Sequence, residues 1–143
     1  MLKTALLHPE ILRALAAAGH GSRVLIADGN YPLSTGSAVG AQRVYLNLRP
    51  GCVTVPEVLS TLTQVLPIES ALGMQTRDGQ PAAIHGEITR ILGAEVPFTL
   101  RPRHDFYAEA RSVDTTLAIA TGEQRRFANV LLTIGVICSN LDA

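Results

Sequence analysis

Apolar residues recur along the chain with two periods, one typical of helices and one typical of strands. After Pro9 they stand at i, i+1, i+4 and i+5, and Gly19 and Gly21 end the pattern, so a helix is predicted to begin at Pro9. Short apolar runs bounded by turn residues predict buried strands. The alternation continues with predicted strands at 23–27, 43–48, 70–76, 96–100, 117–121 and 129–136, and with predicted helices at 82–92 and 103–111.

The clearest local signal is a capping box at the start of a further helix. In Thr54-Val55-Pro56-Glu57, the Thr hydroxyl and the Glu carboxylate can each bind a backbone N–H that the first helical turn leaves unpaired. An apolar stripe suited to burial follows at helical spacing: Val58, Leu59, Leu62, Val65 and Leu66.

Strands that alternate with helices of about a dozen residues are typical of an α/β fold with a largely parallel sheet flanked by helices. The 143 residues suit one domain, and neither a repeat nor a linker divides them. We therefore expect a single domain over residues 1–143. In such sheets ligands bind beyond the carboxyl ends of the strands.

Composition adds an expectation of subunit contacts. Hydrophobic residues make up 47% of the chain and charged residues 17%, against about 25% charged residues in an average protein. This is too apolar for disorder, yet no run approaches the ~18 apolar residues of a membrane span. With so few charges to cover its surface, the chain is expected to bury apolar area against other subunits.

Charge and cysteine content narrow the class of partner and the compartment. Lys and Arg number 12 and Asp and Glu number 12, which leaves no cationic excess to neutralise phosphates. We therefore expect neither nucleic acid nor membrane as a partner. Cys52 and Cys138 do not make the disulfide framework of a small secreted protein, and the first residues do not resemble a signal peptide. Cytoplasmic residence is expected.

Two residues that flank the predicted strand 23–27 carry candidate chemistry, and each has a plainer interpretation. Asp28 follows the strand, where a carboxylate can face a ligand, but Asp-Gly-Asn is also a common turn. His20 stands between two glycines at a helix end, where it can act in catalysis or simply interact with the helix dipole. Pattern alone leaves both interpretations open.

Other chemistries lack a motif. The sequence contains no metal-ligand spacing, no dinucleotide loop and no Gly-x-Ser-x-Gly elbow, so neither a metal nor a cofactor is expected. Aromatic residues make up 4% of the chain and Trp is absent, which excludes an extended stacking platform. Residues 103–107 combine charged and aromatic side chains, a pattern also typical of a solvated helix start.

Several segments, taken in order, resemble the ribose pyranase and fucose mutarotase family, small cytoplasmic enzymes that interconvert the ring forms of free monosaccharides. Each segment is short, but their order and spacing cover nearly the whole chain. They are Met1-Leu2-Lys3, Leu12-x-x-Leu15-x-x-x-Gly19-His20-Gly21, Ile26-Ala27-Asp28, Arg103-x-x-Phe106-Tyr107, Thr121-Gly122-Glu123 and Asn129-Val130-Leu131-Leu132-x-x-Gly135-Val136.

The resemblance implies a cofactor-independent isomerase and assigns its site. It makes His20 the catalytic proton donor, and it makes Asp28, Arg103, Phe127, Ala128 and Asn129 the sugar-binding residues. Arg at position 103 favours the fucose branch over the ribose branch. The family commonly has Tyr where this chain has Phe127, so a phenolic hydroxyl that could bind the sugar is missing here.

The resemblance also implies a ring-forming homo-oligomer, commonly a decamer, with sites built where subunits meet. L-fucose or a related sugar is then the expected substrate. Three alternatives stay open: a D-ribose pyranase that exchanges pyranose and furanose forms, a non-catalytic sugar-binding or transport-associated protein, and an oligomeric scaffold.

Overall fold

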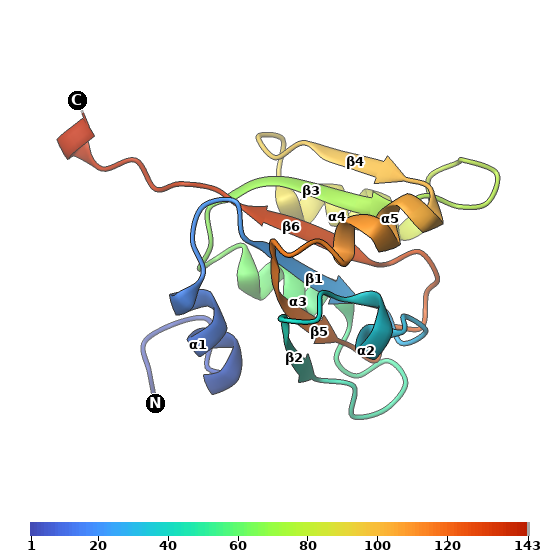
Figure 1. The fold of residues 1–143 in the computed structure, drawn as a ribbon, viewed down its shortest axis with the longest axis horizontal. Coiled ribbons are helices and arrows are strands. Elements are labelled where there is room, and N and C mark those ends of the chain that lie inside the picture. The colour runs from blue at the N-terminus through green and yellow to red at the C-terminus, as the bar shows by residue number, and fades with distance from the viewer. Residues whose placement is uncertain (143) are drawn as a thin grey trace.

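A six-stranded sheet lies between two layers of helices in the computed structural model, which describes residues 1–142 (Figure 1). The strands are β1 (Arg23–Ala27), β2 (Gln42–Tyr45), β3 (Ile68–Met74), β4 (Phe98–Arg101), β5 (Thr115–Ala120) and β6 (Val130–Ile134). The helices are α1 (Pro9–Ala17), α2 (Leu33–Gly36), α3 (Val55–Leu62), α4 (Ala83–Leu92), α5 (Arg103–Ala110) and the 3-10 turn η1 (Asn140–Asp142). The sheet order is β2-β5-β1-β6-β3-β4.

The sheet is mixed but largely parallel as predicted, because within residues 1–142 β6 alone runs against the other five strands. Strand β5 pairs in parallel with β1 and β2, and β3 pairs in parallel with β4, but β6 is antiparallel to both β1 and β3. A parallel return needs a crossover of about a dozen residues, usually a helix. The segment between β5 and β6 is shorter and carries no helix, so β6 re-enters the sheet in the opposite direction.

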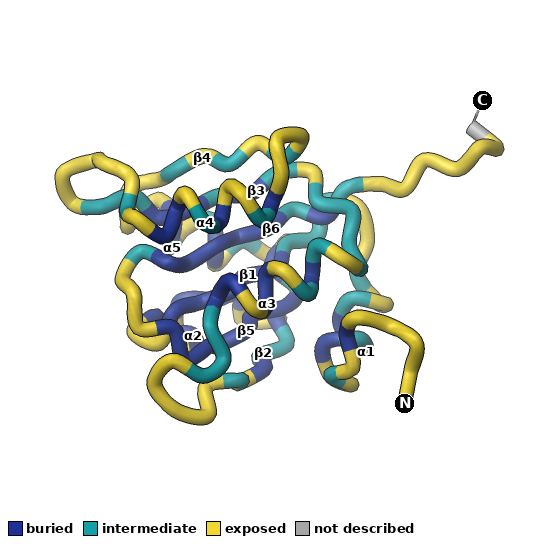
Figure 2. Tube along the Cα trace, turned by 180° about the vertical axis from the view of Figure 1, so that it is seen from behind, coloured by how far each residue is buried: buried dark blue, intermediate teal, exposed yellow. Residues whose placement is uncertain are grey.

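Both faces of the sheet are buried, because residues along each strand alternate between two cores. On β1, Val24 and Ile26 belong to the core under α1, α3 and α4, whereas Leu25 and Ala27 belong to the core under α2 and α5. Figure 2 shows the central strands mostly in the colour of buried residues, whereas exposed residues lie in loops, on outer helix faces and on the edge strand β4. The single domain is therefore a three-layer α/β sandwich.

The predicted helices are confirmed within a residue at their first positions. Helix α1 begins at Pro9, and the His8 side chain accepts a hydrogen bond from the Ile11 N–H. The capping box of α3 is present: the Thr54 N–H donates to the Glu57 carboxylate over 2.7 Å. Helix α2 was not predicted, because its four residues are too few for a period to be visible.

The strand predictions were less accurate at their ends. Strand β2 ends at Tyr45 instead of residue 48, and β6 ends at Ile134 instead of residue 136. Beyond β6 the chain leaves the body as an exposed arm that carries Val136, Ile137 and Leu141 (Figures 1 and 2). No helix within residues 1–142 combines the length and apolarity needed to cross a membrane.

Candidate functional site

A cleft of about 360 Å³ opens at the edge of the sheet where the carboxyl ends of β1, β3 and β4 meet. This volume lies in the usual range of about 300–1000 Å³ for small-molecule sites. The loop that leads into β6 and the start of α5 complete its walls, at the right of Figure 1. The lining residues are Asp28, Asn30, Tyr31, Met74, Gln75, Thr76, Arg77, Pro102, Arg103, Tyr107, Arg126, Phe127 and Asn129.

Asp28 and Asn129 form a reciprocal pair at the floor of the cleft. The Asp28 backbone N–H donates to Asn129 Oδ1 over 2.8 Å, and Asn129 Nδ2 donates to Asp28 Oδ2 over 3.1 Å. The other carboxylate oxygen of Asp28 accepts from the Asn30 N–H over 2.9 Å. Asp28 therefore closes the turn after β1 and also presents a carboxylate to the cleft, so both interpretations of this residue describe the same geometry.

Burial changes the acidity of Asp28. Only 5% of the residue is exposed, and burial raises the pKa of its carboxyl above the ordinary value, although hydrogen bonds from Asn30, Ala128 and Asn129 partly oppose the shift. A carboxylate with a raised pKa is a better proton acceptor than one in water. Asp28 can thus orient a hydroxyl group and take part in moving its proton.

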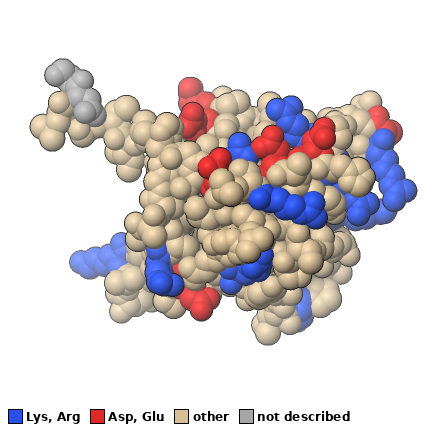
Figure 3. Space-filling model, in the orientation of Figure 1, with Lys and Arg blue, Asp and Glu red and all other residues tan. Residues whose placement is uncertain are grey.

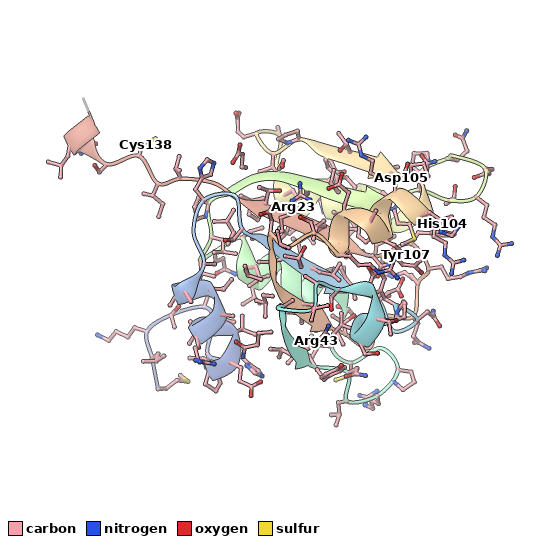
Figure 4. The ribbon with its side chains drawn as sticks, in the orientation of Figure 1. Arg23, Arg43, His104, Asp105, Tyr107 and Cys138 are labelled. Carbon is pink, nitrogen blue, oxygen red and sulfur yellow. The ribbon has the colours of Figure 1, made fainter. Side chains whose placement is uncertain are left out.

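Helix α5 supplies a wall of stacked cationic and aromatic groups, where Figure 4 labels Tyr107. Arg103 Nε donates to the Tyr107 hydroxyl over 3.3 Å, and its guanidinium carbon lies 5.4 Å from the centre of the Tyr107 ring. The Tyr107 ring meets the Tyr31 ring edge-on at 5.2 Å. The Tyr31 hydroxyl donates to the Gly36 carbonyl over 2.6 Å, and burial raises the pKa of Tyr31. Tyr31 is therefore a neutral, fixed support for Tyr107.

Phe127 and Ala128 lie side by side in the chain but differ in exposure. Phe127 is half-buried and lines the cleft, with a positive φ of 65° that is uncommon for a bulky residue. Ala128 is fully buried and does not line the cleft, but its backbone N–H lies near enough to the Asp28 carboxylate to lower the pKa of that group. Ala128 therefore acts on the cleft through its backbone.

The loop that carries these residues is anchored by Arg125. Its Nε and Nη2 atoms donate to the two carboxylate oxygens of Glu123, each over 2.9 Å, and its Nη1 atom donates to Glu87 of α4 over 2.8 Å. Glu123 is only 3% exposed. A bidentate pair with one buried partner holds its geometry well, so the loop enters β6 from a fixed position.

His20 lies apart from the other predicted site residues. His20 precedes β1 and Asp28 follows it, so the two residues lie at opposite ends of this strand. A strand of five residues spans about 17 Å. Its Nε2 atom lies 2.9 Å from Glu69 Oε2, beside a shallow hollow lined by Pro67, Ile68, Glu69, Gly135 and Val136. Within one chain, Asp28, Arg103, Phe127 and Asn129 thus come together, and His20 does not join them.

Sequence reasoning missed several lining residues. Gln75, Thr76 and Arg77 follow β3, and Arg126 precedes Phe127. Their positions follow from the rule that ligands bind beyond strand carboxyl ends, once β3 is known to lie near β1. Figure 3 shows Lys and Arg side chains gathered at this end of the molecule. Tyr107 belongs to a segment that carries the family resemblance, but the sequence assigns it no role in the site.

The cleft offers hydrogen-bonding groups of both kinds around an aromatic wall. A carboxylate, an amide, a guanidinium and a phenol surround a space of small-molecule size, which suits a compact polyhydroxy compound. Within residues 1–142, no group of three or more His, Cys, Asp and Glu side chains is arranged to hold a metal ion.

Comparison with known proteins identifies similar chains over almost the full length. The family model described as RbsD / FucU transport protein family matches residues 1–137. D-ribose pyranase 2 of Streptomyces griseus is 34% identical over 137 residues, which cover 95% of this chain and 98% of that one. The fucose mutarotase of Homo sapiens is 29% identical over 153 residues, with 95% and 93% covered.

Among solved structures, the fold agrees with that of the fucose mutarotase from Streptococcus pneumoniae in complex with L-fucose. The TM-score is 0.76 and the identity 25%, with 96% of this chain and 100% of that chain covered. The mixed sheet and its flanking helices are therefore shared with a protein that binds a free monosaccharide.

Proposed function

This chain belongs to the RbsD / FucU family, and we propose that it is a cofactor-independent isomerase, a monosaccharide mutarotase that opens and recloses the ring of a free sugar. The observation that carries the proposal is the cleft at the strand ends, where the Asp28–Asn129 pair faces Arg103 and Tyr107. The whole chain, residues 1–143, forms one domain with this activity.

The reaction needs little beyond well-placed acids and bases. Ring opening removes a proton from the anomeric hydroxyl and delivers one to the ring oxygen, and closure on the other face reverses both steps. Histidine can hold or release a proton near neutral pH, and His20 is proposed as the proton donor. The Asp28 carboxylate orients the reacting hydroxyl, because burial makes it a strong acceptor.

The remaining residues would bind the sugar. Arg103 and Asn129 are proposed to donate to its outer hydroxyls, and the Phe127 ring is proposed to cover an apolar face of the sugar ring. Ala128 contributes by the N–H that faces Asp28. Phe127 lacks a phenolic oxygen, but Tyr107, which accepts a hydrogen bond from Arg103, brings one to the same cleft.

The proposed site requires a second subunit. His20 flanks the opposite end of β1 from Asp28, so it can act on the sugar only if a neighbouring copy brings it to the cleft. A homo-oligomeric ring, proposed as a decamer, would supply this arrangement at every interface. Cytoplasmic residence stays a prediction of the sequence.

Two sugars compete as the preferred substrate. Arg103 favours a fucose-type sugar, whereas the 34% identity to a D-ribose pyranase favours ribose and an exchange of pyranose and furanose forms. L-fucose or a related sugar is proposed first because Arg103 lines the cleft itself.

Saturation-transfer NMR on a panel of monosaccharides tests the proposal. We expect faster exchange between ring forms of L-fucose or D-ribose than in buffer, and loss of that acceleration in the folded variant His20→Ala. If the ring forms of every sugar in the panel exchange no faster with the protein than in buffer, the proposal of a mutarotase is refuted. If those sugars still raise Tm, the protein is a binding module instead, since ligands stabilise the state that they bind.

A further inference from the structure

A buried histidine links the first turn of α4 to the loop that lines the cleft. His85 is 4% exposed and does not line the cleft. Its ring packs edge-on against Phe98 of β4, with 5.8 Å between the ring centres. The proposed reaction assigns this residue no role, yet both of its ring nitrogens are engaged.

The two hydrogen bonds of His85 define its protonation. Nδ1 accepts from the Ala82 N–H over 2.9 Å, so it carries no proton. Nε2 lies 2.9 Å from the Phe127 carbonyl oxygen, which can only accept, so Nε2 carries the proton. His85 is therefore a neutral imidazole that donates to the backbone of the cleft loop.

The carbonyl that His85 binds belongs to a strained residue. Phe127 has a φ of 65°, a left-handed conformation that a bulky residue keeps only when its surroundings impose it. The peptide unit between Phe127 and Ala128 has a neighbour at both ends: His85 hydrogen-bonds to its carbonyl, and its N–H faces the Asp28 carboxylate and lowers the pKa of that group. One peptide thus connects His85 to the proposed catalytic centre.

We propose that His85 is a positioning residue of this site: by donating from Nε2 to the Phe127 carbonyl it fixes the Phe127–Ala128 peptide and, through it, the Phe127 ring and the Asn129 amide that face the sugar. This inference rests on the proposed function. Phe127 and Asn129 would contact the sugar before and during the reaction alike, so their misplacement should weaken binding more than it slows chemistry.

Three substitutions separate the hydrogen bond to Phe127 from packing and from helix capping. His85→Phe keeps a ring against Phe98 but loses both hydrogen bonds. His85→Asn keeps an acceptor near the Ala82 N–H but is too short to reach Phe127. His85→Gln places an amide nitrogen near the position of Nε2 and keeps the donor.

Exchange kinetics at varied sugar concentration give the first test, at a temperature well below the Tm of every variant. We expect H85F and H85N to raise KM about tenfold with kcat within about twofold of the original, and H85Q to restore a nearly normal KM. An unchanged KM in H85N would overturn the proposal, because capping alone would then explain His85. So would an H85Q variant as impaired as H85N.

Crystal structures of the sugar-free variants give a second test that does not depend on activity. We expect Phe127 to leave the left-handed region and the Asn129 amide to move in H85N and H85F, and both to stay in place in H85Q. Unmoved residues in H85N would overturn the proposal even if the protein exchanges no sugar. A protein that exchanges no sugar but shows the expected shifts would refute the proposed function and leave the link to Phe127 intact.

Discussion

Asp28 illustrates how one side chain serves both structure and chemistry. The sequence placed it after a strand, in a turn, and could not choose between a capping role and a ligand-binding role. Its carboxylate does cap the Asn30 N–H and also faces the cleft beside Asn129. Asn129 lies 101 positions away in the chain, so this pairing was invisible to local patterns. The resemblance assigned both residues to one site but did not predict their contact.

Replacing Asp28 should change both the pH dependence of stability and the binding of the sugar. Its pKa in the native state is raised from 3.8 by burial, so the native state loses stability as the pH rises above 3.8 and the carboxylate ionises. Asp28→Asn removes that charge and keeps an acceptor for Asn30, but it leaves Asn129 Nδ2 without its acceptor. We expect calorimetry to show that the Tm of the original protein relative to that of D28N falls between about pH 4 and pH 7, and we expect KM to rise about 10- to 100-fold, the value of a hydrogen bond to a charged group. A Tm difference that changes in the other direction would contradict the sign.

His85 should make stability depend on pH in the direction opposite to that of Asp28. Burial lowers its pKa from 6.5, against the opposing effect of the Phe127 and Met74 carbonyls. Below about pH 6.5 the unfolded chain takes up a proton that the native state refuses, so the free energy of unfolding falls as the pH falls. Urea melts at pH 7.5 and 5.5 should show that the advantage of the original protein over H85Q shrinks on acidification. An advantage that grows on acidification would show a native pKa above 6.5.

Helix α3 is the element that the sequence described most completely. The capping box was read from four residues, and the structure contains both of its hydrogen bonds. The apolar stripe is confirmed as far as Leu62, since Val58, Leu59 and Leu62 are buried. The helix ends there, so Val65 and Leu66 lie beyond it and are only partly buried. Local hydrogen bonding and helical periodicity are encoded within a few neighbouring residues, so such features can be predicted without tertiary information.

Removing the cap of α3 should cost a measurable part of its stability. Thr54→Ala deletes the acceptor of the Glu57 N–H and a donor to the Glu57 carboxylate, and we expect the free energy of unfolding to fall by about 1 kcal/mol. Thr54→Ser, which keeps the hydroxyl, is the matched control. Equal losses in both variants would show that the methyl group, and not the cap, stabilises the helix.

Two glycines should respond in opposite ways to alanine. A Cβ at Gly122, just beyond β5, would overlap the carbonyl oxygens of Arg49 and Cys52, so Gly122→Ala should lower the free energy of unfolding by about 1–3 kcal/mol. Gly86 is exposed within α4 with nothing near a new Cβ, so Gly86→Ala should raise it by about 1 kcal/mol. Denaturant melts of both variants check these changes. A G122A variant as stable as the original protein would show that the loop carrying Arg49 and Cys52 can move away from the new Cβ.

Strand direction was the element-level property that the sequence did not yield. The run at 129–136 was correctly read as a strand, but an apolar run looks the same in either direction. Only the short, helix-free connection from β5 indicates reversal, and β6 then pairs with β1 and β3 instead of with β5. Burial on both faces erased the alternation that would have marked the strand ends.

At the scale of the whole molecule, several large apolar residues are exposed, and the predicted proton donor His20 lies away from the cleft. Val39, Leu48, Val113 and Ile137 are more than 80% exposed, and Figure 4 shows Cys138 on the arm that extends from the body. His20 lies beyond the opposite end of β1 from Asp28. In the proposed assembly of copies, these apolar residues would be buried against neighbouring subunits, and His20 of one subunit would meet Asp28 of another.

Mixing impaired variants tests this arrangement. If His20 acts on the cleft of a neighbour, coexpression of His20→Ala with Asp28→Asn should restore about a quarter of the sites to the original rate, measured at a sugar concentration at which each variant alone gives little exchange. Coexpression of Asp28→Asn with the double variant should restore none. Light scattering should give about 152 kDa for ten copies of a 15.2 kDa chain. A monomer, or mixtures without recovered activity, would contradict a shared site.

Local chemistry was readable from the chain alone: where helices begin, which runs are buried, and which residues stand at strand ends. These features depend on neighbours a few positions away. The tertiary structure decided what depends on distant partners: the reversal of β6, the pairing of Asp28 with Asn129, the separation of His20 from the cleft, and the bond from His85 to the Phe127 carbonyl. A side chain's partner across the fold leaves no periodic trace in the sequence, because packing sets it only after the elements have formed.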